Sequence, residues 1–209
     1  MMKKLLHIIA TPRAEASATL KISGEFLTCC ADERRDWKIE TLNLFDKKLP
    51  ALTVQHIEGK FHLLGGEDLP DELKEAWREL IVYIEQFSFT DEYLISCPMW
   101  NFSIPYVLKH YLDIIVQPKY LFRYTPNGPE GLMKNKKMVI ITSRGGDYSG
   151  EPARSYDHQI PYLKAIFNFV GITDIRFINA QPMDAMGPDI RRAKIETASS
   201  EAKTIALRF

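Results

Sequence analysis

The sequence predicts an α/β fold in which a doubly wound, five-stranded parallel sheet carries helices on both faces. Five short strand-like segments, which are apolar runs or alternate between apolar and polar residues, themselves alternate with segments whose apolar residues recur at helical spacing. This alternation is typical of parallel strands joined by crossover helices. A length of 209 residues fits one mid-sized domain, so we expect residues 1–209 to form a single domain. The chain is 45% hydrophobic and 26% charged, which is close to the globular average.

The first part of the chain predicts two strands, one helix and a long irregular segment. Residues 5–9 form an apolar run that is ended by Thr-Pro-Arg, as expected of a buried strand. A helix is expected from Ser17, a suitable N-cap, to about residue 30. Residues 38–44 alternate as a second strand. Residues 45–69 contain a proline and three glycines and are expected to be irregular, long enough to act as a flap, although their role stays open.

The rest of the chain continues the alternation of strands and helices. The strands are expected at 93–97, 138–142 and 175–179, and the helices at 70–87, 104–115, 160–170 and 188–207. Residues 116–133 form a second segment that we expect to be irregular. Ligands of such folds lie beyond the carboxyl ends of the strands, where the strand order reverses. The loops that follow the first, third and fourth strands are therefore the candidate site.

Charge and cysteine content make several classes of protein function improbable. The 27 Lys and Arg residues balance the 27 Asp and Glu residues, so the basic excess expected of a nucleic-acid binder is missing. Three cysteines, two of them adjacent, are a poor disulfide framework. The apolar run near the N-terminus is too short for a signal peptide, and no run approaches the 18 residues of a membrane span. We therefore expect a cytoplasmic protein that binds neither nucleic acid nor membrane.

The loop after the first strand can hold an anion. It contains Thr11, Ser17 and Thr19 but neither a dinucleotide-binding fingerprint nor a nucleotide-triphosphate loop. Hydroxyl groups and unpaired amides at a helix N-terminus favour a phosphate. Plain N-capping by Ser17 is the alternative interpretation of the same residues.

Two further loops can approach a flat ligand. Residues 98–102 place aromatic side chains and a methionine around Asn101, a composition that suits a heteroaromatic ring; a loop packed on its own sheet is the alternative. Gly145 and Gly146 follow the fourth strand directly and allow the backbone to come close to a ligand, although a Gly-Gly pair is often simply a turn.

Several segments together resemble a known family. Residues 98–102 (Pro-Met-Trp-Asn-Phe), 122–132 and 142–146 (Thr-Ser-Arg-Gly-Gly) look like the signature segments of the FMN-dependent NADH-azoreductases. Residues 161–163 and 169–174 fit the same pattern. Members of this family are homodimeric, flavodoxin-like NAD(P)H:quinone and azo oxidoreductases. The resemblance therefore implies a flavodoxin-like fold, an FMN cofactor and a homodimer.

The resemblance also implies the residues of the site. The FMN contacts would be Thr11, Ser17, Ala18, Thr19, Pro98, Met99, Trp100, Asn101, Phe102, Ser143, Arg144, Gly145 and Gly146. Substrate contacts would come from Asn101, Tyr124 and Phe167, with Ile166 and Phe167 forming a pocket wall in the partner subunit. This chain departs from the family in having Thr11 for a common Ser, Ala14 for a common Gly, and Thr19 for the second Ser of Ser-x-Ser.

The activity implied by the resemblance requires no catalytic side chain and no metal, because the flavin carries the hydride. NAD(P)H would reduce FMN, and a quinone or azo compound would then be reduced in a ping-pong cycle. Backbone amides near Trp100, Asn101, Gly145 and Gly146 would stabilise negative charge on the reduced ring. Tyr124 can instead be a packing residue of a dimer-interface loop.

Two other function classes are weighed against this one. A flavodoxin-type electron carrier is usually smaller and acidic, which the zero net charge and the two long segments do not favour. A structural or regulatory domain that keeps the fold without the cofactor is the other alternative, since fold alone does not determine function.

Overall fold

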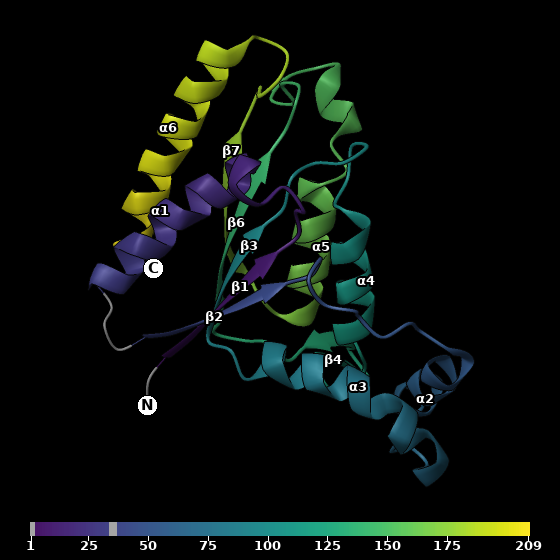
Figure 1. The fold of residues 1–209 in the computed structure, drawn as a ribbon. Helices are drawn as coiled ribbons and strands as arrows, with labels where there is room; N and C mark the ends of the chain where they lie inside the picture. The colour runs from purple at the N-terminus through teal and green to yellow at the C-terminus, as the bar shows by residue number, and fades with distance from the viewer. Residues whose placement is uncertain (1–2, 34–36) are drawn as a thin grey trace.

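The computed structural model describes residues 3–33 and 37–209, and Figure 1 shows a central sheet with helices on both sides. The five parallel strands are ordered β2-β1-β3-β6-β7. They are β1 (Lys3–Ile9), β2 (Trp37–Asn43), β3 (Glu92–Ser96), β6 (Lys137–Ser143) and β7 (Asp174–Ala180). The order reverses between β1 and β3. The predicted doubly wound sheet is confirmed.

Two helical layers cover the sheet because successive side chains of each strand point to opposite faces. Leu5, Leu94 and Val139 pack with the helices α1 (Ala18–Glu33) and α6 (Pro188–Ala206) on one face. Leu6 and Ile95, one residue along, pack on the other face with α3 (Asp71–Ser88), α4 (Tyr106–Ile115) and α5 (Ile160–Val170). Two short 3-10 helices, η1 (Ala14–Ala16) and η2 (Ala153–Tyr156), lie in the loops at the carboxyl edge.

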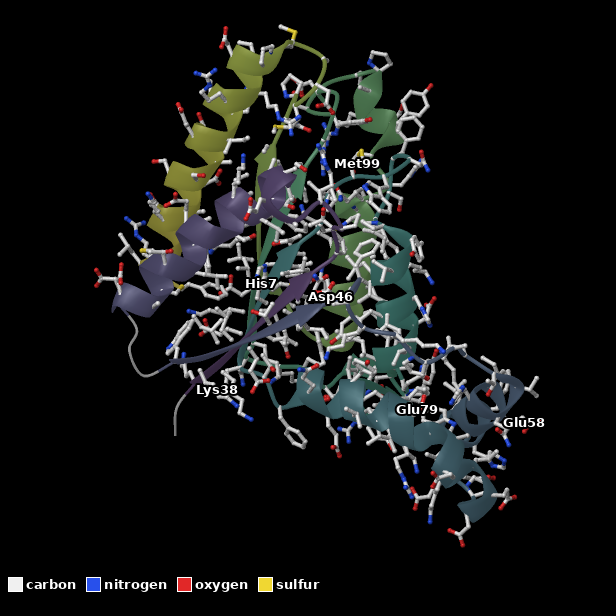
Figure 2. All side chains as sticks on the ribbon, in the orientation of Figure 1. His7, Lys38, Asp46, Glu58, Glu79 and Met99 are labelled. Carbon is white, nitrogen blue, oxygen red and sulfur yellow. The ribbon has the colours of Figure 1, made fainter. Side chains whose placement is uncertain are left out.

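The segment 45–69 is not wholly irregular, which corrects one prediction. It contains α2 (Val54–Leu64), which begins with a capping box between Thr53 and His56. Gly59 lies against the buried ring of Trp77 in α3, where a Cβ atom would be only 2.2 Å from Trp77 Nε1. Figure 2 shows Glu58 of α2 far from Met99, which lies at the carboxyl edge of the sheet. Within its own chain, α2 is therefore not a flap over that edge.

The segment 116–133 also contains regular structure that was not predicted. Strands β4 (Phe122–Thr125) and β5 (Gly128–Gly131) pair as an antiparallel hairpin. Gly128, at φ +106°, and the bond from Thr125 Oγ1 to the Gly128 carbonyl (2.9 Å) form its turn. The hairpin docks on the end of α5, where the Met133 amide donates to the Val170 carbonyl at 2.8 Å.

Candidate functional site

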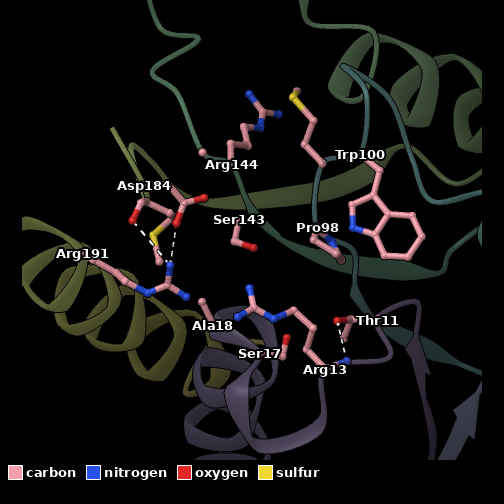
Figure 3. Close-up of a pocket in the computed structure, with 13 residues that line it drawn as sticks. Thr11, Arg13, Ser17, Ala18, Pro98, Trp100, Ser143, Arg144, Asp184 and Arg191 are labelled. Carbon is pink, nitrogen blue, oxygen red and sulfur yellow. Dashed lines mark hydrogen bonds and ion pairs between the residues drawn. The ribbon is translucent and has the colours of Figure 1, made fainter. Parts of the chain in front are cut away.

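A cavity of about 240 Å³ lies where the carboxyl ends of the parallel strands meet (Figure 3). It is lined by Thr11, Arg13, Ser17, Ala18, Pro98, Met99, Trp100, Ser143, Arg144, Gly145, Met183, Asp184 and Arg191. The three loops selected from the sequence thus contribute to one cavity. Sequence reasoning missed the fourth contributor, the β7–α6 loop with the start of α6, because it carries neither a glycine pair nor a row of hydroxyl groups.

Ser17 both caps α1 and lines the cavity, so the two interpretations of this residue are compatible. Its Oγ accepts from the Leu20 amide at 3.4 Å, and its carbonyl accepts from the Lys21 amide at 3.1 Å. Thr19 Oγ1 lies 2.8 Å from Ser17 Oγ, and the Thr19 side chain is fully buried. The first turn of a helix presents unpaired N–H groups, which makes this end of the cavity suitable for an anion.

A buried chain of hydrogen bonds connects the start of α1 to the middle of the sheet. Ser23 Oγ donates to the Thr19 carbonyl at 2.7 Å, so in the Ser23–Ser96 hydroxyl pair Ser96 is the donor. Ser96 Oγ, 2.8 Å from His7 Nε2, must then accept from it, which assigns the Nε2–H tautomer to His7. Burial lowers the pKa of His7 from 6.5 to about 4, so the imidazole is neutral at pH 7.

The loop after β3 is a tight turn held by paired backbone hydrogen bonds. The amides of Trp100 and Ser103 donate to each other's carbonyls at 2.9 and 3.0 Å. Asn101 and Phe102, at the turn's centre, have φ values of +46° and +69°, a left-handed conformation that is costly for residues other than glycine. The Trp100 amide is used within this turn and is not open to a ligand, contrary to the expectation for amides near Trp100.

A second cavity adjoins the first at Trp100. It measures about 500 Å³ and is lined by Trp100, Asn101, Ser103, Ile104, Tyr106, Lys109 and Tyr162. The Trp100 ring packs between Phe45 and Tyr106, at centroid distances of 5.9 and 6.5 Å. Asn101, a predicted site residue, lines this second cavity together with its aromatic side chains.

The loop after β6 uses its arginine internally. The Arg144 side chain is 2% exposed; Nη1 pairs with Asp157 at 3.0 Å, and Nε donates to Gln159 Oε1 at 3.2 Å. Gln159 Nε2 in turn donates to the Cys97 carbonyl at 3.0 Å, which ties this loop to the end of β3. Nε and Nη1 of the guanidinium are thus engaged within the protein, while Nη2 is buried and has no partner among the described residues.

Gly145 is tied to the loop after β7 through its carbonyl, which accepts from the amides of Met183 and Asp184, each at 3.1 Å. Within the described part of the chain, the amides of Gly145 and Gly146 donate no hydrogen bond. Both N–H groups are therefore available to a ligand. A Cβ atom at Gly145 would lie 3.2 Å from Asp184 Oδ2, so the missing side chain keeps this approach open.

Six predicted residues line neither cavity: Thr19, Phe102, Tyr124, Gly146, Ile166 and Phe167. Phe167 is 1% exposed and stacks on Phe87 inside the core, so it does not form a pocket wall. It is one of the apolar residues of α5 that pack in the core. Tyr124 is 62% exposed on β4, beside Phe122. Phe102 is half-exposed and packs against Tyr156 at 5.4 Å.

The comparisons with known proteins agree with this geometry. A family model of the flavodoxin-like fold matches residues 3–205. The FMN-dependent NADH:quinone oxidoreductase of Nitratidesulfovibrio vulgaris is 35% identical over 209 residues and covers all of both chains. This chain belongs to that family. Another member, FMN-dependent NADH:quinone oxidoreductase 2 of Clostridium acetobutylicum, is 37% identical over 206 residues, which are 97% of this chain and 99% of that one.

Solved structures support the same family. An azoreductase from Bacillus anthracis superposes with a TM-score of 0.90 at 31% identity and covers all of both chains. An FMN-dependent NADH-azoreductase from the same organism, solved with FMN, superposes with a TM-score of 0.84 at 28% identity, covering 98% of this chain and 100% of that one. The family predicted from residues 98–102, 122–132 and 142–146 is thus confirmed.

Two further findings concern only residues 3–33 and 37–209. None of their helices combines the length and the apolar character that crossing a membrane requires. No three His, Cys, Asp or Glu side chains among them lie close enough together to hold a metal ion.

Proposed function

We propose that this protein is an FMN-dependent oxidoreductase that uses NADH to reduce quinones and azo compounds. The observation that carries the proposal is the cavity at the strand-order reversal, which joins the start of α1 to loops 98–103 and 143–146. It offers an anion site at one end and the free amide of Gly145 at the other, as a ring-bearing phosphate monoester requires. The names of the relatives and of the solved azoreductases agree with it.

The residues fit FMN by their chemistry. The hydroxyl groups of Thr11 and Ser17 and the first amides of α1 would hold the phosphate, and the buried Thr19 Oγ1, 2.8 Å from Ser17 Oγ, would position Ser17. The amides of Gly145 and Gly146 would face the polar edge of the ring and favour negative charge on it. The predicted contacts from Pro98, Met99, Asn101, Phe102 and Ser143 belong to this proposal. FMN supplies the hydride chemistry, which no side chain here provides.

The second cavity would receive the nicotinamide and the acceptor. Its wall of Trp100, Tyr106 and Tyr162 is flat and apolar, which suits planar rings, and Asn101 adds one polar contact. A single such space beside the flavin would serve donor and acceptor in turn. This is why we propose a ping-pong order.

Steady-state kinetics test the proposal. NADH oxidation in the presence of menadione or methyl red should turn over continuously, and reciprocal rate plots at several acceptor concentrations should be parallel. A single stoichiometric reduction without turnover would identify an electron carrier instead. Intersecting lines would reject the ping-pong order while leaving the activity standing. NADPH, tested in parallel, would show which nicotinamide donor is used.

We also propose a homodimer of one-domain subunits that works in the cytoplasm, where NADH is found. Exposed aromatic side chains near the second cavity support the dimer: Tyr106 is 69% and Tyr156 53% exposed. Tyr124 would then be a contact across the interface. Light scattering after gel filtration should give twice the mass of one chain, and the mass of a single chain would contradict the dimer.

A further inference from the structure

Two arginines from distant parts of the chain line the same end of the first cavity. Arg13 comes from the loop after β1 and Arg191 from the first turn of α6, and both line it together with Ser17 and Ala18. Figure 3 shows the two guanidinium groups pointing from opposite sides into the space near Ala18. Like charges that face each other in this way repel, so their arrangement favours an anion between them.

The charge of this end of the cavity is only partly balanced. Of the described residues that line the cavity, Asp184 alone carries a carboxylate. Arg144 is already paired with Asp157, outside this cation pair. Arg13 forms no ion pair within the part of the chain that the structure describes. One positive charge therefore remains without a partner, next to the N-terminus of α1.

Arg191 has a partner that a phosphate can replace. Its Nη1 lies 2.7 Å from Asp184 Oδ1, and the Asp184 side chain is 71% exposed while that of Arg191 is 29% exposed. An ion pair that is open to water contributes little, because the solvent screens it. A phosphate dianion offers the guanidinium two oxygens in the fork geometry that arginine binds best.

We infer that Arg191, held by Asp184 in the free protein, binds the phosphate of FMN together with Arg13 and makes the site prefer FMN to riboflavin. This inference rests on the proposed function, since it takes FMN as the ligand. It adds a specificity-determining residue from α6, an element outside the loops that the sequence points to.

The test compares FMN with riboflavin, which has the same ring without the phosphate. Quenching of flavin fluorescence gives the dissociation constant of each ligand for the wild type and for Arg191→Gln. FMN should bind roughly 10- to 100-fold more weakly to the variant, since a charge-assisted hydrogen bond is lost. Riboflavin should change by less than about twofold. Arg191→Lys should restore part of the FMN affinity, and the FMN affinity of Arg191→Gln should depend less on salt.

Arg192→Gln is the matched control. Arg192 is the next residue, 71% exposed and paired with Asp189 at 3.3 Å, so its loss should leave both dissociation constants unchanged. Asp184→Asn removes the competing carboxylate and should bind FMN at least as tightly as the wild type. A selective loss of FMN affinity in Asp184→Asn would contradict the inference that Asp184 competes with the phosphate for Arg191.

The outcomes separate this inference from the proposed function. If the wild type binds FMN but Arg191→Gln weakens the binding of FMN and of riboflavin by the same factor, the inference is wrong and the proposed function stands. The same holds if Arg191→Gln changes the binding of neither flavin. If the wild type binds neither flavin, the proposed function fails and the inference fails with it. Thermal melting without ligand shows whether Arg191→Gln and Arg192→Gln are equally folded.

Discussion

Ala14 holds a left-handed backbone conformation in the first loop of the site, with φ at +41°. This conformation costs an L-residue about 1–2 kcal/mol, whereas glycine adopts it freely. The resemblance noted in the sequence places a glycine here in the family. Alanine in place of glycine at this position therefore strains the backbone of the loop locally.

Ala14→Gly should stabilise the protein. The relieved strain exceeds the extra unfolded-state entropy of glycine, so the free energy of unfolding should rise by about 0.5–1 kcal/mol. Ala16→Gly, two residues on in the same short helix, is the control and should destabilise by about 0.5–1 kcal/mol, because Ala16 has no positive φ to relieve. Urea denaturation measures both. A loss of stability in Ala14→Gly would show that the loop is not strained.

His7 predicts a pH dependence of stability. The folded pKa is lowered to about 4 from 6.5, so the unfolded chain takes up a proton first as the pH falls. Full stability is present above pH 6.5 and is lost between pH 6.5 and 4, by about 3 kcal/mol in total. His7→Gln keeps an N–H donor for Ser96 but cannot titrate, so its slope of unfolding free energy against pH should be smaller in this window.

The control for His7 is Gln55→Asn, which changes an exposed side chain that cannot titrate. Its slope of unfolding free energy between pH 6.5 and 4 should be that of the wild type. If His7→Gln and the wild type lose stability in parallel, the imidazole is not held neutral in the folded protein.

At the scale of elements, the packing of α2 on α3 depends on the missing side chain of Gly59. Trp77 is fully buried and cannot move away from a Cβ atom at this position. Gly59→Ala should therefore lose about 1–2 kcal/mol, because overpacking exceeds the gain in helix propensity. Gly24→Ala in α1 meets nothing within 4 Å and should gain up to about 1 kcal/mol. Thermal unfolding compares the two, and a stabilised Gly59→Ala would mean that the contact is looser than described.

The elements that sequence reasoning missed are those whose burial pattern is unusual. Helix α2 leaves Val54 and Phe61 exposed, so its apolar residues do not mark a face that is buried in this chain. The hairpin has strands of only four residues, although the Pro126-Asn127-Gly128 sequence was a turn signal that could have been used. The strands β1, β3 and β6 were predictable because both faces of the sheet are covered there, which gives continuous apolar runs, whereas the edge strands β2 and β7 alternate between apolar and polar residues.

At the scale of the whole molecule, the sheet explains why three separate loops could be assigned to one site. Parallel strands place all their carboxyl ends at one edge, so hydroxyl groups and glycines that follow different strands must meet. The direction in which an individual side chain points could not be predicted in this way. Arg144 turns into the protein toward Asp157, and Arg191 reaches the cavity from a helix with no recognisable motif.

The central claim is that this edge of the sheet holds FMN that exchanges electrons with NADH and a quinone. An anaerobic titration of the FMN-loaded protein, followed at the visible flavin band, tests it most directly. One equivalent of NADH should bleach the band, and one equivalent of menadione should then restore it. A protein that does not retain FMN, or whose bound flavin keeps its colour when NADH is added, would contradict the claim.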